Sequence, residues 1–332
     1  PKRYLINSDY YLNADHRCGW KPTILQAINS NTLIKPTSNT KIYDSDILLI
    51  DGMDQIWSPW TVDSQGGIPT KMTKPWLGII HYMLDIPAHI GFQSAGIILM
   101  NAKSSFEHCK GIVTLSNTCK EQITKFMSQI GYGDIPIHTI KHPMGKLESR
   151  FSLKNFQENK RTRLIIQVGM QYRKVTTIYH LKTSYDKMWL PGQVNKAIMC
   201  AELEWSKDLK QKKPLPVNDV HILRTQTIQE YDELLLNNIV IIPVWTASAN
   251  NAVLECMVMN IPAFVTRTPG TEEYLGKNYP MFFNEIEELE RIINNEKELL
   301  KLYEITNKYL IQLDKTDIQY EHFNSELLKL IN

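Results

Sequence analysis

The sequence has few cysteines, and their positions exclude the structures that cysteine usually supports. Over 332 residues the five are Cys18, Cys109, Cys119, Cys200 and Cys256, without a paired or metal-ligand spacing. Scattered thiols in odd number are typical of a reducing compartment rather than of a disulfide framework. No cluster of His and Cys predicts a zinc site. We therefore expect reduced cysteines and a cytoplasmic protein.

Long apolar runs and glycine-rich nucleotide motifs are also missing. No apolar stretch approaches the ~20 residues that cross a bilayer. The absence of Walker-type and G-x-G-x-x-G sequences argues against an ATPase or a nicotinamide enzyme. The one Asp-x-Asp pair, Asp44 with Asp46, leads directly into a strand, so we expect no metal site there. The chain opens at Pro1 rather than Met, which is compatible with a trimmed N-terminus.

Composition and charge indicate a soluble globular protein. Hydrophobic residues make up 43% of the chain and charged residues 22%. The net charge of +2 is too small to indicate a nucleic-acid partner by itself. With 332 residues, the chain is long enough for two domains, each with its own core.

The first half of the chain alternates strand-like and helix-like segments. Each apolar run is bounded by turn residues, and helical stretches lie between the runs. Alternation of this kind predicts a parallel sheet covered on both faces. The expected strands are Asp46–Gly52, Trp76–Leu84, Gly111–Ser116 and Ile135–Pro143, and the expected helices include Lys21–Ser30 and Asn117–Ile130.

A second series of strands and helices follows the polar segment Phe151–Arg163, which we interpret as a linker. Helical spacing after Asn284 predicts a helical tail packed on the second domain. The fold class is thus α/β, with two Rossmann-like domains, residues 1–155 and 156–332. The expected elements of the second domain are the strands Arg163–Gly169, Val220–Arg224, Ile239–Val244 and Ile261–Thr266, and the helices Thr176–Leu181, Ile228–Asn238, Asn250–Met259, Ile286–Tyr309 and Gln319–Leu330.

The segment Ile239–Tyr279 is the most informative about function. Its first strand gives way to the small polar residues Ser248, Asn250 and Asn251, which suit the start of a helix. Free amides and the helix dipole favour phosphate at such a position. Glu255 lies seven residues after Ser248, roughly 10 Å along the axis at ~1.5 Å per residue. A phosphate at the helix start and a ribose beside Glu255 would fit one nucleoside diphosphate, although an ordinary surface glutamate is an equally open interpretation.

In these segments the chain resembles the GT-B glycosyltransferases, above all uncharacterised members encoded by large DNA viruses and some bacteria. The resemblance rests on the motifs WLGIIH, SFEHCKGIVTLS, VGMQYRK, EYDELL, ASANNAVLECM and EEYLGKNYP. It covers about Trp76–Ser116 and Arg163–Phe283, whereas residues 1–75 match only in general character. The order of ASANNAVLE and EEYLG is its most specific part. The resemblance implies two Rossmann-like domains that face each other across a cleft, where a nucleotide sugar binds.

The resemblance also implies roles for residues of the second domain. Glu255 matches a glutamate that holds the donor ribose. Arg173 and Lys174, just after the strand that ends at Gly169, match a basic pair that neutralises the pyrophosphate. Fixed cations would stabilise the leaving diphosphate, because its negative charge increases as the glycosidic bond breaks. The alternative is that Arg173 and Lys174 are a solvated pair in a loop without a ligand. Retaining families often carry another glutamate eight residues before the first, where this chain has Ala247, so the stereochemistry stays open.

Further candidates lie at strand ends. His81 is expected to contact the donor sugar, or else to bond the backbone as a core histidine. Asp51 is a candidate general base for the acceptor hydroxyl, or a residue that caps the following turn. Glu272 and Glu273 follow a Pro–Gly turn, near the donor in similar transferases, where negative charge also suits the first turn of a helix. Arg224 is expected to frame the nucleobase pocket.

These residues predict an enzyme that transfers a hexose or related sugar from a UDP- or GDP-sugar. The acceptor is a carbohydrate, a protein or another molecule, and no metal or other cofactor is expected. If the chain is viral, it would act in the host cytoplasm. The alternatives are a nucleotide-sugar epimerase of the same fold, a non-catalytic two-domain ligand-binding protein, and a transferase acting on a modified DNA base, against which the near-neutral charge speaks.

Overall fold

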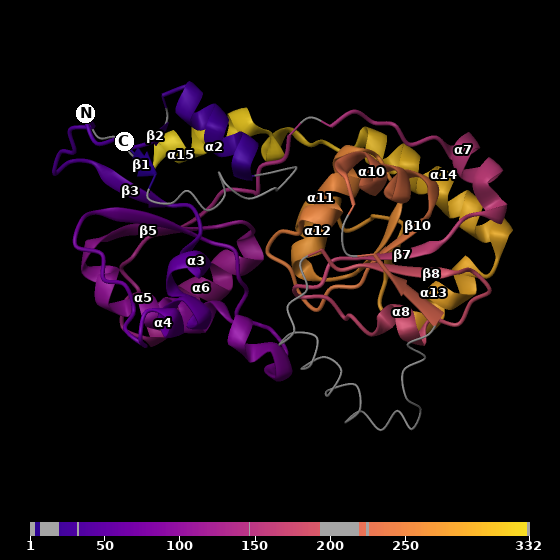
Figure 1. Ribbon diagram of the computed structural model, residues 1–332, viewed down its shortest axis with the longest axis horizontal. Helices are drawn as coiled ribbons and strands as arrows, with labels where there is room; N and C mark the ends of the chain where they lie inside the picture. The colour runs from indigo at the N-terminus through magenta and orange to yellow at the C-terminus, as the bar shows by residue number, and fades with distance from the viewer. Residues whose placement is uncertain are drawn as a thin grey trace. The chain divides into compact units, whose positions relative to one another are not determined.

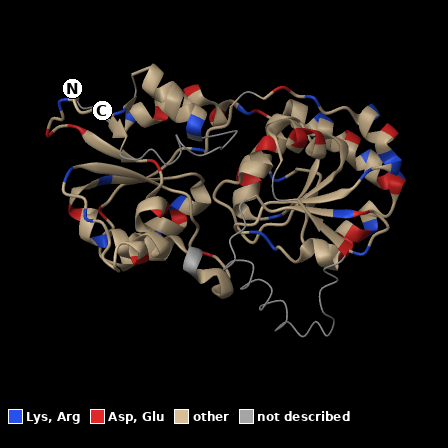
Figure 2. Ribbon diagram, in the orientation of Figure 1, with Lys and Arg blue, Asp and Glu red and all other residues tan. Residues whose placement is uncertain are grey.

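The protein consists of two compact units, each built on its own parallel β-sheet (Figure 1). Acidic and basic residues are interspersed along the helices (Figure 2), in keeping with the small net charge. Among the residues that the structure describes, no helix has both the length and the apolar content needed to cross a bilayer. The computed structural model describes residues 4–6, 20–31, 33–145, 147–192, 219–223 and 226–330.

The first unit contains Pro1–Ile86, Gly91–Lys146 and Lys315–Asn332. Its six strands are parallel and lie in the order β2-β1-β3-β4-β5-β6. The central strand β4 is buried at every position, as expected of a parallel strand covered on both faces. The elements are β1 (Tyr4–Ile6), α2 (Trp20–Asn29), β2 (Leu33–Ile34), β3 (Ile47–Ile50), α3 (Met53–Trp57), α4 (Pro59–Ser64), β4 (Trp76–Ile80), α5 (Ala95–Ala102), η2 (Lys103–His108), β5 (Cys109–Thr114), α6 (Asn117–Gln129), β6 (Ile137–Thr139), η5 (Thr316–Ile318) and α15 (Tyr320–Lys329).

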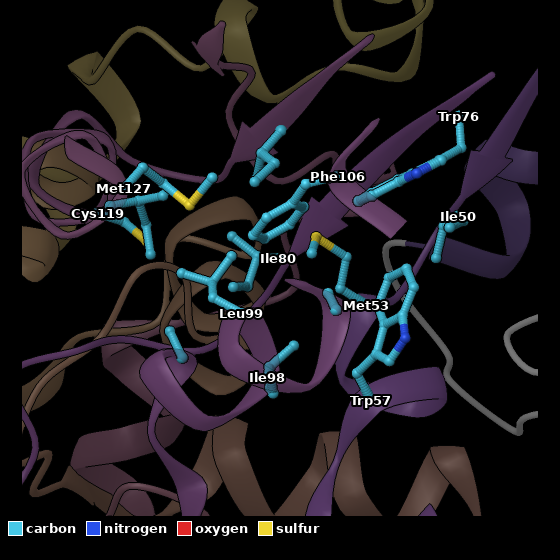
Figure 3. Packing of buried hydrophobic residues seen from close by; sticks show 14 of the residues in the cluster. Ile50, Met53, Trp57, Trp76, Ile80, Ile98, Leu99, Phe106, Cys119 and Met127 are labelled. Carbon is cyan, nitrogen blue, oxygen red and sulfur yellow. The ribbon is translucent and has the colours of Figure 1, made fainter. Parts of the chain in front are cut away.

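Two tryptophans organise the core of the first unit (Figure 3). The rings of Trp57 and Trp76 have centroids 5.2 Å apart. Their indole N–H groups donate to the backbone carbonyls of Thr70 and Ser105, so neither ring buries an unsatisfied donor. A Cβ on Gly78 would approach the Met53 sulfur to 2.7 Å, so glycine is needed for helix α3 to pack this closely on β4. The core therefore fixes helix α3, which follows β3, against the middle of β4.

The second unit contains Pro87–Ile90 and Leu147–Asp314. Its six parallel strands follow the order β12-β11-β10-β7-β8-β9. Strands β7, β10 and β11 are buried at every position. The 3-10 helix η1 (Ala88–Gln93) spans the division between the units. The other elements are α7 (Leu153–Glu158), η3 (Asn159–Arg161), β7 (Ile165–Val168), α8 (Thr177–His180), β8 (Lys187–Leu190), β9 (Val220–Ile222), α10 (Ile228–Asn237), β10 (Ile239–Ile242), α11 (Asn251–Val258), β11 (Ala263–Thr266), α12 (Pro269–Leu275), β12 (Phe282–Phe283), α13 (Ile286–Ile293) and α14 (Glu296–Gln312).

The segment interpreted as a linker is instead part of the second unit, and that interpretation was wrong. Ser152 caps helix α7 by accepting a hydrogen bond from the backbone N–H of Asn155. Phe156 is fully buried and stacks on Tyr303 of α14, with ring centroids 4.0 Å apart. One buried aromatic among polar residues leaves no periodic signal in the sequence, and the partner ring lies about 150 residues away, so the helix was missed.

The division between the units also differs from the boundary expected after residue 155. Residues 147–155 group with the second unit, and the last helix, α15, groups with the first. Figure 1 shows α15 beside α2, and Gln26 of α2 donates a hydrogen bond to Glu321 of α15. The chain before α15 is held by an ion pair of 2.6 Å between Lys141 and Asp317. The tail is thus shared between the units, because α14 packs on α7 and α13 of the second unit and α15 on α2 of the first.

Candidate functional site

Two loops at the carboxyl edge of the second sheet are fastened to each other. They follow β7 and β10, the neighbouring strands at the centre of that sheet. The backbone N–H of Lys174 donates to the carbonyl of Pro243 at 2.7 Å, and that of Trp245 donates to the carbonyl of Tyr172 at 2.9 Å. Tyr172 has a φ of +57°, an uncommon conformation for a residue with a side chain. Ligands of open α/β sheets bind at this edge, and here it offers a rigid platform.

Arg173 lies at the centre of this platform. Its side chain is buried, with the residue only 8% exposed. The guanidinium donates three hydrogen bonds to neutral oxygens: Nε to the carbonyl of Val168 at 3.1 Å, Nη1 to that of Gln171 at 2.9 Å, and Nη2 to Oδ1 of Asn250 at 2.8 Å. Gly169 has a φ of +86°, and a Cβ there would lie 2.8 Å from the Arg173 Nη2 atom. Glycine is therefore needed both for the turn and for the position of the guanidinium.

Helix α11 begins beside this guanidinium. Asn250 is its N-cap, and the same Oδ1 that binds Arg173 accepts a hydrogen bond from the backbone N–H of Val253 at 3.3 Å. Ser248, two residues before the cap, is buried, and Asn251 is the half-buried first residue of the helix. The structure thus binds Arg173 to Asn250 and places Gly169 beside the guanidinium, whereas the phosphate-binding role expected for these residues stays a prediction.

The electrostatics of Arg173 differ from those of Arg163, a second buried arginine among the described residues of this unit. Burial lowers the pKa of Arg173 from 12.5 to about 10, against a smaller opposite effect of the nearby Tyr231. Across the described ranges, no carboxylate lies within salt-bridge distance of Arg173. Arg163, by contrast, pairs with both oxygens of Glu296 at 3.2 Å. A buried cation surrounded only by neutral oxygens favours the approach of an anion.

Glu255 lies one turn further along α11 and is also buried, at 8% exposure. Its Oε2 atom accepts a hydrogen bond of 2.8 Å from the hydroxyl of Tyr231 on α10. Sequence reasoning missed Tyr231, because the two residues belong to different helices and no local spacing connects them. An ordinary surface glutamate, the other interpretation of Glu255, is therefore excluded.

Lys174 lies beside an aromatic ring of the same platform. Its ammonium is 5.0 Å from the centroid of the Trp245 ring, within the range of a cation–π contact. The edge of that ring meets His89, with centroids 5.6 Å apart and planes at 75°. Trp245 was not among the sequence candidates, since a tryptophan after a buried strand is more often a core residue.

Helix α12 packs closely against the loop after β10. A Cβ on Gly270 would lie 1.7 Å from the carbonyl oxygen of Ala247, so only glycine permits this approach. Glu272, in the first turn of α12, forms an ion pair of 2.6 Å with Arg267. Glu273 is half-buried on the same helix. Glu272 thus has an internal partner, whereas the donor roles expected for both glutamates stay predictions.

The first-unit candidates lie at the carboxyl edge of their own sheet. Asp51 follows β3 directly and is fully buried. His81 follows β4 and is half-buried, with its Nε2 atom 2.9 Å from the backbone carbonyl of Asp51. This contact matches the interpretation of His81 as a histidine bonded to backbone, and it also fixes the ring at the strand end. Arg224 lies outside the described residues.

A cavity of about 750 Å³ in the second unit lies away from these residues. It is lined by residues of α10 and of the segment before β7, including Asn159, Thr162, Gln226 and Glu230. None of the candidate residues that the structure describes lines it, so its size does not make it the candidate site. In the described part of the chain, His, Cys, Asp and Glu side chains do not form a group of three that could hold a metal ion.

Comparison with solved structures identifies the fold. No protein-family profile and no curated protein sequence matches the chain. A sucrose-phosphate synthase from Thermosynechococcus elongatus is similar with a TM-score of 0.61 and 12% identity, covering 99% of this chain and 98% of its own. The N-terminal domain of trehalose-6-phosphate phosphatase from Candida albicans is similar with a TM-score of 0.56 and 14% identity, and the match covers 92% of this chain and 72% of its own.

The catalytic domain of starch synthase IV from Arabidopsis thaliana, bound to ADP and acarbose, gives a TM-score of 0.52 and 12% identity, covering 93% of this chain and 76% of its own. At such low identity the similarity shows the fold alone. The chain therefore has the GT-B fold, with two parallel six-stranded sheets, flanking helices and helices at the C-terminus.

Proposed function

We propose that the chain is a glycosyltransferase that moves a sugar, a hexose or a related one, from a nucleoside diphosphate donor to a hydroxyl-bearing acceptor. The donor is a UDP- or GDP-sugar, the acceptor is a carbohydrate or a protein, and the reaction needs no metal or other cofactor. The enzyme would act in the cytoplasm, that of the host if the chain belongs with the viral transferases that it resembles.

The observation that carries the proposal is the buried guanidinium of Arg173 at the start of α11. A diphosphate beside it would gain a charge-assisted hydrogen bond from a planar fork of donors, together with the favourable end of a helix dipole. Lys174, the next residue in the chain, adds a second cation to the same platform. Glu255, one turn further along α11, is placed for the ribose of the same nucleotide.

The chemistry follows from this arrangement. The bond between the sugar and the terminal phosphate breaks, a new bond forms to the acceptor oxygen, and the acceptor proton is released. The departing diphosphate takes the electron pair of the broken bond, so its negative charge rises. Cations that are already fixed in place stabilise this charge without reorganising, which is how Arg173 and Lys174 would accelerate the reaction. His81 and Asp51 of the first unit are proposed to contact the sugar and the acceptor hydroxyl.

The starch synthase solved with ADP and acarbose has the same fold, which adds support for a nucleoside diphosphate ligand. A nucleotide-sugar epimerase of this fold would use the same phosphate site, and only the products separate the two. A non-catalytic binding protein would have no need for a strongly desolvated cation beside the phosphate. Transfer to a modified DNA base is less favoured, because acidic and basic residues are interspersed along the helices (Figure 2).

The test begins with thermal unfolding in the presence of UDP, GDP, ADP, CMP and dTDP, each with magnesium and with EDTA. A ligand at 100 times its dissociation constant stabilises the protein by about 2.7 kcal/mol. The nucleotide that binds then identifies the sugar donors to incubate with simple sugar acceptors. Transfer to an acceptor supports the proposal, an epimerised donor supports the epimerase, and no nucleotide binding under any condition contradicts both.

A further inference from the structure

Tyr231 is held in place before any ligand arrives. Helix α10 starts with a capping box: the hydroxyl of Thr227 accepts from the backbone N–H of Glu230, and the Glu230 carboxylate accepts from the N–H of Thr227 at 2.7 Å. The next residue, Asp232, forms an ion pair of 2.7 Å with Arg150. Tyr231 lies between these two fixed points, in the first turn of α10, so its ring is carried by an immobilised backbone.

The hydroxyl of Tyr231 is directed at the Glu255 carboxylate. The hydrogen bond of 2.8 Å is a phenol donating to a buried carboxylate oxygen, which is stronger than a bond between neutral groups. A glutamate side chain otherwise samples several rotamers, and fixing them on binding would weaken affinity. An ionised carboxylate has about four acceptor positions, so the bond from Tyr231 is compatible with further bonds to the same group.

We infer that Tyr231 is a positioning residue that holds Glu255 for the two neighbouring hydroxyls of a ribose, so that the site selects ribonucleoside over 2′-deoxyribonucleoside diphosphates. The inference rests on the proposed function and goes beyond it by making dTDP-sugars disfavoured donors. Two oxygens of one oriented carboxylate match a vicinal diol, whereas a 2′-deoxyribose offers only one of the two hydroxyls. The site would distinguish ribose from 2′-deoxyribose through the orientation of the Glu255 carboxylate. Tyr231, carried by α10, fixes that orientation.

The same residue connects the sugar and phosphate ends of the site. Tyr231 also lies close enough to Arg173 to affect that residue electrostatically, against the dominant effect of burial. Arg173 in turn binds the N-cap of the helix that carries Glu255. Tyr231 thus joins α10 to α11 through Glu255, and Arg173 joins the loop after β7 to α11 through Asn250, so α11 carries the partners of both residues.

The experiment compares wild type with Tyr231→Phe, which removes one oxygen atom and keeps the ring. Titration calorimetry measures the dissociation constants of UDP, GDP, ADP and CDP and of their 2′-deoxy forms. We expect wild type to prefer the best ribonucleotide by about tenfold, the value of one hydrogen bond to a charged group. Tyr231→Phe should bind the ribonucleotide about tenfold more weakly than wild type does. Its affinity for the deoxy form should stay within about twofold of the wild-type value.

Tyr185→Phe is the matched control, because Tyr185 donates a similar bond of 2.9 Å to Glu296 elsewhere in the same unit. It should leave the preference for ribose intact. If wild type discriminates and Tyr231→Phe discriminates equally well, the inference is overturned while the proposed function stands. If wild type binds none of the nucleotides, the proposed function fails and the inference fails with it.

Discussion

Replacing Arg173 by methionine separates a functional buried cation from a structural one. Burial lowers the pKa of Arg173 from 12.5 to about 10. At about 1.4 kcal/mol per pH unit, the folded protein holds this charge at a penalty of about 3 kcal/mol. The three hydrogen bonds of the guanidinium contribute about 1.5 kcal/mol each in the opposite direction. Methionine has a similar reach and no charge, so we expect Arg173→Met to lower the free energy of unfolding by only about 1–2 kcal/mol.

Ligand binding should respond far more strongly than stability. In wild type, a nucleoside diphosphate at 100 times its dissociation constant adds about 2.7 kcal/mol, or about 5–10 °C in Tm for a domain of this size. Arg173→Met removes the phosphate partner, so the ligand-induced shift should disappear at the same ligand concentration. Urea unfolding and thermal unfolding with and without ligand measure both quantities.

Arg163→Met is the matched control, since it removes another buried arginine of the same unit. Arg163 pairs with Glu296, and breaking a buried ion pair on one side costs about 3–5 kcal/mol. The free energy of unfolding should therefore fall more in Arg163→Met than in Arg173→Met. The folded fraction of Arg163→Met should still show the ligand-induced rise in Tm. The reasoning is refuted if Arg173→Met keeps the ligand-induced shift, or if it loses as much stability as Arg163→Met.

Three further changes test the platform and the fold. Trp245→Leu removes the ring under the Lys174 ammonium, so nucleoside diphosphate affinity should fall about threefold to fivefold, the value of an exposed cation–π contact, as measured by calorimetry. Gly270→Ala places a Cβ 1.7 Å from the Ala247 carbonyl oxygen, so it should destabilise the second unit by about 1–3 kcal/mol in urea unfolding and weaken nucleotide binding. Burial, and to a smaller extent the charge of Lys120, lowers the pKa of His138. The unfolded chain therefore binds more protons than the folded one, and the free energy of unfolding should fall as the pH drops through about 6.5. His138→Asn should make that fall shallower.

Each of these changes has a control or a contradicting result. Tyr132→Leu removes the ring of a similar contact with Lys103 in the first unit and should leave nucleotide affinity unchanged. A Cβ on Gly91 would meet no atom within 4 Å, so Gly91→Ala should unfold like wild type. An acid limb of the pH–stability curve that is identical in wild type and His138→Asn would show that His138 does not contribute.

The sequence alone determined most of the architecture. Long β-branched runs such as Ile239–Ile242 predicted buried parallel strands, because strands covered on both faces must be apolar at every position. The strands β1, β2, β8 and β12 were not predicted, since none of them contains consecutive β-branched residues and two of them are only two residues long. The N-cap of α11 at Asn250 followed from local chemistry, because an N-cap bonds within its own first turn.

What only the tertiary structure decided are the relations between distant segments. The bond from Arg173 to Asn250 joins residues 77 positions apart, and the bond from Tyr231 to Glu255 joins residues 24 positions apart. The helix within residues 153–158 and the place of α15 in the first unit likewise depend on partners far along the chain. Sequence patterns report which face of an element is apolar, but not which element will cover it. The proposed function depends on those long-range pairings, because desolvation and orientation exist only once the chain has folded.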